Sequence, residues 1–269
     1  MLQSRIQRPI PERLSHFTNL GALKSILSDK EGKGICLRAF SNRCKNDDQE
    51  IKMGKYMLER VLKVLPSGAS LLNRFGGYES TGSVSFMEGE VNEHMLEYGH
   101  YRLEFDLKEI GVGVLTNGLV DCEYVPQNQL VEYADEYCEM ISCTFNDIPK
   151  LQKKYGKFSP QIVFNLSHFF MMELDIMSKV FSVKEEKWKE EKEWRKLIQF
   201  KNNEPHIHYY QGKPYMNFYL DKNKLTGITV FCSKDNKEQA QKDANDIKKY
   251  VSDRGYNAKV RVEVFEKQD

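Results

Sequence analysis

The sequence predicts a single α+β domain over residues 1–269, in which helices surround a mixed, largely antiparallel sheet. Short segments in which apolar and polar residues alternate indicate strands, and longer segments with apolar residues every three or four positions indicate helices. Two glycine-containing turns indicate antiparallel hairpins. A strand–helix–strand succession over about 222–269 indicates a C-terminal βαβ unit with parallel strands.

The chain opens with a predicted strand over 14–18. The helix that follows has its apolar residues three and four positions apart: Leu20, Leu23, Ile26 and Leu27. Thr18 or Asn19 is suited to cap this helix. A second strand is predicted over 35–40, and the polar residues 46–48 then favour the start of a second amphipathic helix.

The next part of the chain predicts a loop, a strand, a helix and another strand. The glycine-rich segment 67–82 is typical of a loop, and a strand is predicted over 83–87. The acidic segment 88–97 favours a helix. Residues 101–107 alternate between apolar and polar side chains, which predicts a half-buried strand.

Two turns organise the second half of the sequence. Asn117-Gly118 precedes the strand-like segment 119–125, and the Asn-Gly pair favours a type I′ hairpin turn. Gln211-Gly212-Lys213 separates the strand-like segments 207–210 and 215–220 in the same way. Both features predict antiparallel strand pairs.

Amphipathic segments predict the remaining elements. Residues 130–141 favour a helix, and 162–181 favour a buried one. The chain ends with a strand over 227–232, a helix over 235–254 and a strand over 260–265, which form the predicted βαβ unit.

Composition indicates a folded cytoplasmic protein. The 269 residues suit one domain, and 40% hydrophobic with 12% aromatic residues is typical of a packed core. No apolar segment follows the first residues, so no secretion signal is predicted. Polar residues interrupt 162–181 too often for a membrane span. The six cysteines include no CxxC pair and are expected to be reduced thiols.

Charge and motifs argue against several classes of protein. Lys and Arg number 40 against 39 Asp and Glu, so nucleic-acid binding would need a local basic patch. The absence of Walker, GxGxxG, GxSxG and HExxH motifs argues against nucleotide hydrolases, α/β-hydrolases and zinc proteases. His206 and His208 would share one strand face, but no further ligand follows at a suitable spacing. We therefore expect a solvated hairpin edge there and no metal site.

His16 lies where the first predicted strand meets the first predicted helix. Such junctions bring backbone amides and side chains into one cleft, which suits anionic ligands. His16 is therefore a candidate binding residue. The alternative is a buried histidine that holds the turn.

Trp188 and Trp194, the two tryptophans of the chain, bracket a run of carboxylates. Their large apolar surfaces predict an anchored segment rather than a loose tail. The carboxylates before Glu193, Glu191 included, are expected to be solvated, whereas Glu193 adjoins the following strand and is expected to be partly buried. Arg195 shares its strand face and is placed to hold it ionised. Glu193 is then either a working carboxylate or part of a structural network with Arg195.

Several segments resemble those of the bacterial domain of unknown function 2971 family. Residues 14–18 are similar to its His-Tyr-Thr-Ser opening. Residues 46–50 are similar to its Asn-Asp-x-x-Glu segment, with Asp48 in place of the usual proline. Residues 83–86 and 95–99 resemble its serine strand and Met-Trp-x-x-Tyr segment, with leucine in place of tryptophan. Five residues match its Lys…Trp-x-x-Glu-x-Glu-x-Arg pattern: Lys184, Trp188, Glu191, Glu193 and Arg195.

The order of these segments is similar to that of ADP-ribosyltransferases, including bacterial DNA-modifying toxins. The resemblance implies that His16 contacts the ribose or nicotinamide of NAD, and that Tyr98 or Tyr101 stacks on the nicotinamide. It implies that Glu193 binds the ribose and stabilises an oxocarbenium-like transition state, with Glu191 activating the acceptor. The implied NAD-binding residues are His16, Thr18, Asn46, Asp47, Glu50, Ser85, Tyr98 and Arg195.

We therefore expect an NAD-dependent ADP-ribosyltransferase-like or NAD-cleaving enzyme of bacterial stress or phage defence. NAD would be its substrate, and a nucleic acid or protein its macromolecular acceptor, without a metal or a membrane. The fold would then be ADP-ribosyltransferase-like. The alternative is a non-catalytic module that binds a ligand or an operon partner protein, in which the same residues form a buried structural network.

Overall fold

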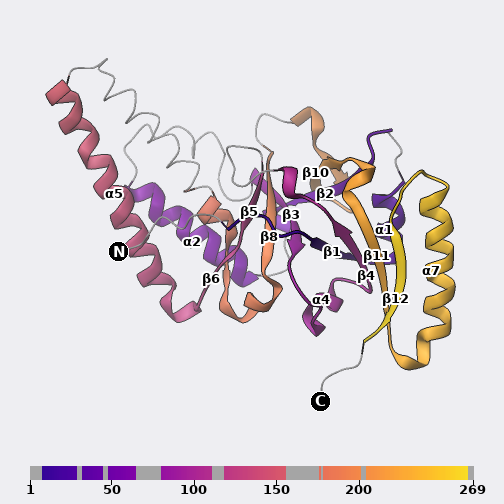
Figure 1. The fold of residues 1–269 in the computed structure, drawn as a ribbon. Helices are drawn as coiled ribbons and strands as arrows, with labels where there is room; N and C mark the ends of the chain where they lie inside the picture. Colours follow the sequence, from indigo (N-terminus) through magenta and orange to yellow (C-terminus); the bar gives the residue numbers. More distant parts are fainter. Residues whose placement is uncertain are drawn as a thin grey trace.

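The structure is a computed structural model, and it describes residues 8–28, 32–44, 48–64, 80–110, 118–155, 176, 178–200 and 204–265. The predicted α+β class is confirmed: ten strands form one mixed, mostly antiparallel sheet, and helices lie around it (Figure 1). Most of the predicted loop 67–82, the turn residue Asn117 and most of the predicted helix 162–181 lie outside the described residues.

The sheet runs in the order β12-β11-β4-β1-β3-β2-β10-β9, and β8 and then β5 extend it from β3. Its strands are β1 (Leu14–Thr18), β2 (Ile35–Ser41), β3 (Thr81–Met87), β4 (Tyr101–Phe105), β5 (Leu119–Asp121), β8 (Glu193–Gln199), β9 (His208–Tyr210), β10 (Lys213–Leu220), β11 (Leu225–Cys232) and β12 (Lys259–Val264). A separate parallel pair consists of β6 (Glu123–Val125) and β7 (Val183–Glu185).

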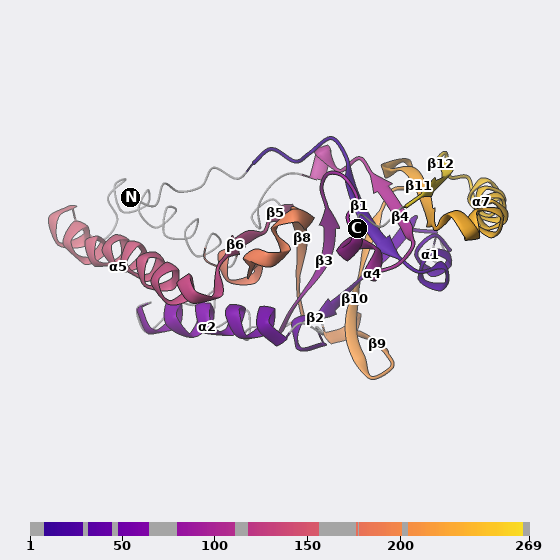
Figure 2. The same ribbon diagram turned by 90° about the horizontal axis from the view of Figure 1, so that it is seen from below.

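Helices gather at the two ends of the sheet. The α-helices are α1 (Leu20–Ile26), α2 (Asp48–Val64), α4 (Glu93–Glu97), α5 (Leu130–Tyr155) and α7 (Lys237–Ser252). Helix α7 packs on β11 and β12, whereas α2 and α5 lie together at the far end (Figures 1 and 2). Among the described helices, none combines the length and apolarity needed to cross a membrane.

Local sequence signals account for several elements. The Asn19 side chain accepts a hydrogen bond from the Ala22 N–H at 2.9 Å and so caps α1. Gln211 and Gly212 have φ angles of 49° and 74°, as a two-residue type I′ turn between β9 and β10 requires. At the C-terminus, β11 and β12 are parallel, with α7 between them in sequence, so the predicted βαβ unit is confirmed.

The sheet forks at β3. One edge of β3 pairs with β8 along its whole length, from Thr81 to Met87. The opposite edge is shared, because its register with β2 covers Gly82 and Ser83 whereas its register with β1 covers Met87. Strands β1 and β2 therefore diverge beside the middle of β3, where the backbone of Ser85 meets side chains from the neighbouring strands.

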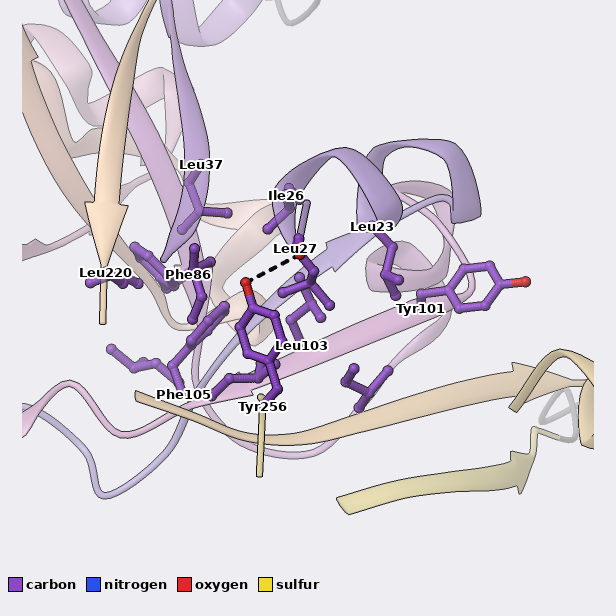
Figure 3. Close-up of a cluster of buried hydrophobic side chains, with 14 of the residues drawn as sticks. Leu23, Ile26, Leu27, Leu37, Phe86, Tyr101, Leu103, Phe105, Leu220 and Tyr256 are labelled. Carbon is purple, nitrogen blue, oxygen red and sulfur yellow. Dashed lines mark hydrogen bonds between the residues drawn. The ribbon is translucent and has the colours of Figure 1, made fainter. Parts of the chain in front are cut away.

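The main core lies between the sheet and helices α1 and α7. Figure 3 shows α1 side chains facing aromatic and aliphatic residues of β3 and β4. The Tyr256 hydroxyl, at the end of the loop after α7, donates to the Leu27 carbonyl at 3.2 Å and ties the two helices together. A second core joins α2 and α5 to Ile176, Val180, Phe181 and Val183. Burial of both apolar sets is the main force that holds these elements on the sheet.

Three sequence predictions are wrong in detail. The predicted helix 88–97 is limited to Glu93–Glu97, where the Asn92 side chain accepts from the Met95 N–H. Strand β4 is buried on both faces. Its apolar side chains lie in the main core, and on the other face Arg102 pairs with Glu104 and packs on the Phe231 ring. Residues 119–125 form two strands instead of one, β5 on β8 and β6 on β7. In each case contacts with sequence-distant elements decide the outcome.

Replacing Gly99 with alanine is expected to destabilise the fold. Gly99 has a φ of 143°, and a Cβ atom there would lie 2.1 Å from the Thr18 carbonyl oxygen. We expect Gly99→Ala to lower the free energy of unfolding by about 2–4 kcal/mol. Gly21→Ala in α1 is the control, since its Cβ would meet no atom closer than 3.5 Å. Urea unfolding compares the two, and equal stability would contradict the assigned backbone.

Candidate functional site

A cavity of about 700 Å³ opens at the fork of the sheet. Its walls come from β1, β2, β3, α2, β7 and β8 and from the 3₁₀ helix η5 (Glu186–Glu191). Six of the residues singled out from the sequence line it: His16, Glu50, Ser85, Tyr98, Glu193 and Arg195. His16 and Glu193 thus face one cavity, although β3 separates their strands. The volume is in the range of small-molecule sites.

His16 is the middle residue of β1, and its side chain is hydrogen-bonded to the backbone of β3 at the fork of the sheet. Its Nδ1 donates to the Ser85 carbonyl oxygen at 2.9 Å. Burial lowers the pKa of His16 below its ordinary value of 6.5, although this hydrogen bond opposes the shift. The ring is therefore neutral near pH 7, with its proton on Nδ1 and its lone pair on Nε2. His16 can offer a ligand a hydrogen-bond acceptor.

Glu193 and Arg195 form the predicted pair at the start of β8. Arg195 Nε lies 2.8 Å from Glu193 Oε1, and Nη2 lies 3.1 Å from Oε2, so the contact is bidentate. The other side of the guanidinium contacts Glu50 of α2, with Nη1 2.8 Å from Oε1. Glu193 and Arg195 are each 1% exposed, so Glu193 is more deeply buried than the sequence predicts.

Lys184 and Glu191 complete the network. Lys184 Nζ is hydrogen-bonded to Glu191 and lies 2.8 Å from Glu193 Oε2. Glu191 is only 1% exposed, so the prediction that it is solvated is wrong. Lys184 of β7 and Tyr98 reach Glu191 from distant parts of the chain and cover it. Lys192, whose φ is 44°, turns the chain between η5 and β8. That turn lets both carboxylates reach one ammonium group.

Burial and pairing act against each other in this network. Desolvation raises the pKa of Glu191, and the nearby Lys184 only partly offsets it. Desolvation is the largest influence on Lys184 and opposes its charged form, but Glu193 and Glu191 together with Tyr98 outweigh it and raise the pKa of the ammonium group. Two cations, Lys184 and Arg195, thus face three carboxylates, Glu50, Glu191 and Glu193.

Tyr98 connects the cavity to Glu191. Its side chain lines the cavity and its residue is 49% exposed, while its hydroxyl donates to Glu191 Oε1 at 3.1 Å. Tyr101, the other aromatic candidate, lines a different hollow of about 830 Å³ beside α7 and donates to Asp243 at 3.1 Å. Of the two tyrosines, only Tyr98 is placed to contact a ligand near Glu193.

The other residues predicted to bind NAD are Thr18, Asn46 and Asp47. Thr18 ends β1, is buried, and is not among the described residues that line the cavity. Asn46 and Asp47 lie outside the described residues. Sequence reasoning did not assign a role to Lys184, although the lysine lies at the start of the motif that contains Glu191 and Glu193.

The prediction that His206 and His208 share one strand face is wrong. His206 ends a 3₁₀ helix and His208 begins β9, so the two are not neighbours on one strand face; both are exposed. Within the described residues, no group of three or more His, Cys, Asp and Glu side chains is arranged to hold a metal ion.

Comparisons with protein-family models, with curated proteins and with solved structures find no match for this chain. The family resemblance stays a prediction.

Removing Lys184 is expected to destabilise the protein strongly. Lys184→Met leaves Glu191 and Glu193 without their shared cation, and breaking a buried ion pair costs about 3–5 kcal/mol. Lys189→Met is the matched control, because this lysine is exposed and makes only a surface pair with Glu186. Urea unfolding at pH 7 measures both variants. A loss below about 1 kcal/mol for Lys184→Met would contradict the buried network.

His16 is expected to titrate below pH 6.5. Because its folded-state pKa is lowered, its contribution to stability is present above pH 6.5 and is lost as the pH falls toward the folded pKa. NMR titration of the imidazole protons measures the pKa. His16→Gln should remove this part of the acid destabilisation, whereas His94→Gln, at an exposed position, should retain it. A pKa at or above 6.5 would contradict the buried neutral ring.

Proposed function

We propose that the protein binds NAD in this cavity and cleaves its nicotinamide–ribose bond, as an ADP-ribosyltransferase-like or NAD-cleaving enzyme of bacterial stress or phage defence. One observation carries the proposal: His16 and Glu193, which are far apart in the sequence, line the same cavity. Tyr98 lines it too, so the hydrogen-bond-accepting imidazole of His16, the aromatic ring of Tyr98 and the carboxylate of Glu193 border one cavity of ligand size. This convergence supports NAD, because the three groups suit its amide, its pyridinium ring and its ribose.

His16 would orient NAD. Its Nδ1–H is engaged by Ser85, so its Nε2 accepts a hydrogen bond from the nicotinamide amide or a ribose hydroxyl. Tyr98, half-exposed on the wall, offers a ring face to the nicotinamide. A positioned substrate reacts faster because the orientation is fixed before the bond breaks.

Glu193 would stabilise the transition state. When the bond between C1′ of the ribose and N1 of nicotinamide breaks, the electron pair leaves with nicotinamide and positive charge develops on the sugar. A fixed carboxylate opposes that charge electrostatically. Arg195 and Lys184 hold the Glu193 carboxylate in place from two sides, which gives it a fixed geometry before the substrate arrives.

The acceptor oxygen would be activated through Tyr98. Glu191 is not among the described residues that line the cavity, but Tyr98, whose hydroxyl donates to Glu191, does line it. An acceptor that bonds to C1′ would pass its proton to the Tyr98 oxygen as that hydroxyl passes its own proton to Glu191. The raised pKa of Glu191 suits a group that must take up a proton near neutral pH.

A second function has one observation in its favour. Glu193 is 1% exposed and is bonded to both Lys184 and Arg195, as expected of a structural network in a non-catalytic ligand- or partner-binding module. The two functions differ in what Glu193→Gln changes. A structural carboxylate affects stability alone, whereas a working one affects the reaction beyond any loss of stability.

Incubation with NAD, with chromatography of released nicotinamide and calorimetry of NAD binding, tests the proposal. We expect Glu193→Gln to lower the rate at least about 100-fold, since a fixed charge opposite the sugar is lost. Tyr98→Phe, which retains the ring, should slow transfer but still bind NAD. Glu190→Gln is the control, because this neighbouring carboxylate is exposed.

Thermal unfolding of each variant separates stability from activity. If the wild-type protein neither binds NAD nor releases nicotinamide, the enzymatic proposal is wrong. If Glu193→Gln then lowers only the melting temperature, the binding-module alternative is supported.

A further inference from the structure

Three successive strands form one end of the sheet beside the cavity. Strand β10 pairs antiparallel with β2 on one side and with β9 on the other. Figure 2 shows the β9–β10 hairpin extending beyond the neighbouring strands. Cross-strand partners project from the same face of a sheet. We call one face of these strands the basic–aromatic face; it carries Arg38, Phe40, His208, Tyr210, Lys213 and Tyr215.

The rings on this face contact one another and a cation. The ring centroids of Tyr215 and Phe40 are 5.5 Å apart, and those of Tyr215 and His208 are 5.4 Å apart. The Arg38 guanidinium lies 5.0 Å from the ring centroids of both Tyr210 and Tyr215. Tyr210 remains 48% exposed. The face therefore presents pre-arranged aromatic surfaces with positive charge between them.

The charge of these strands has one sign. Strands β2, β9 and β10 contain Arg38 and Lys213 and no aspartate or glutamate, and the Gln211-Gly212 turn adds none. These two cations are no denser than in the chain as a whole, but no carboxylate within the three strands neutralises them, so the strands carry a net positive charge. A partner that fits it is anionic and offers flat groups for stacking.

We propose that the basic–aromatic face binds single-stranded nucleic acid and leads it toward the cavity. Unpaired bases stack on aromatic side chains, while Arg and Lys bind the phosphates. A duplex keeps its bases stacked on each other and cannot use the rings in this way. An acidic peptide would satisfy the cations but would not use the row of rings.

Arg38 and Phe40 connect the two sites. Both belong to the basic–aromatic face, and both also line the cavity of about 700 Å³. A strand stacked on Tyr210 and Tyr215 would therefore extend toward His16 and Glu193. The delivery of a base or sugar as acceptor rests on the proposed NAD chemistry, whereas the binding of the strand does not.

Fluorescence anisotropy with labelled oligonucleotides of about 12 nucleotides, in the absence of NAD, tests the binding. The probes are a mixed-sequence single-stranded DNA, the corresponding RNA and the DNA duplex. We expect both single strands to bind more tightly than the duplex, and the tighter of the two identifies the sugar preferred. Affinity should fall as salt rises from about 50 to 200 mM.

Tyr210→Ala should weaken binding about tenfold, since one stacking surface is lost. Tyr209→Ala is the matched control: Tyr209 is 67% exposed and adjacent, but pairs with Pro214 and projects from the opposite face. It should bind like the wild type. Lys213→Ala should reduce the slope of log affinity against log salt by about 0.7.

The proposal would be overturned if neither single strand bound at low salt. It would also be overturned if Tyr209→Ala and Tyr210→Ala weakened binding of the oligonucleotide equally. Complete displacement of the oligonucleotide by poly-glutamate would overturn it too, and would indicate an acidic protein partner. Because NAD is absent, failure here leaves the nicotinamide-release experiment unaffected. Conversely, strand binding without nicotinamide release would support the face and reject the NAD chemistry.

Discussion

The bidentate contact between Arg195 and Glu193 is the interaction on which the candidate site depends. Removing these charges from water costs several kcal/mol per ion, and only complete pairing offsets that cost. Arg195 therefore also pairs with Glu50 of α2, and Glu193 also pairs with Lys184 of β7. The requirement to pair buried charges thus joins a helix and two strands that lie far apart in sequence. The same pairing holds Glu193 and Arg195 in the wall of the cavity. His16, from the other side of β3, lines the same cavity.

Much of the fold is encoded in local patterns. Residues 35–41 alternate between buried and half-buried side chains as a strand requires, Asn19 is suited to cap a helix, and Gln211-Gly212 accepts the positive φ angles of a hairpin turn. Each of these signals depends only on residues within a few positions of one another. The C-terminal βαβ unit was predictable for the same reason, because its helix and strands follow one another with strong periodicity.

The features that were missed depend on distant contacts. The alternation in 101–107 predicts one solvated face, but the polar side chains Arg102 and Glu104 are buried as well. They pair with each other, and Phe231 and Arg261, from distant strands, contact them. Glu191 lies in a charged run that reads as solvated, and it is buried because Lys184 and Tyr98 reach it from elsewhere. The pairing of Glu193 with Arg195 was predictable, because the two residues are two positions apart on one strand. The contact between Glu193 and Lys184 was not predictable, because Lys184 lies on a different strand, β7.

Strand β12 ends the described sheet, and its sequence explains why the sheet stops there. Its side chains alternate between half-buried and exposed, and the exposed ones are Lys259, Arg261 and Glu263. A strand from a second molecule that paired with this edge would have to strip water from a row of charges. The chain can therefore carry a long sheet with an open edge and still resist the edge-to-edge aggregation to which such sheets are prone.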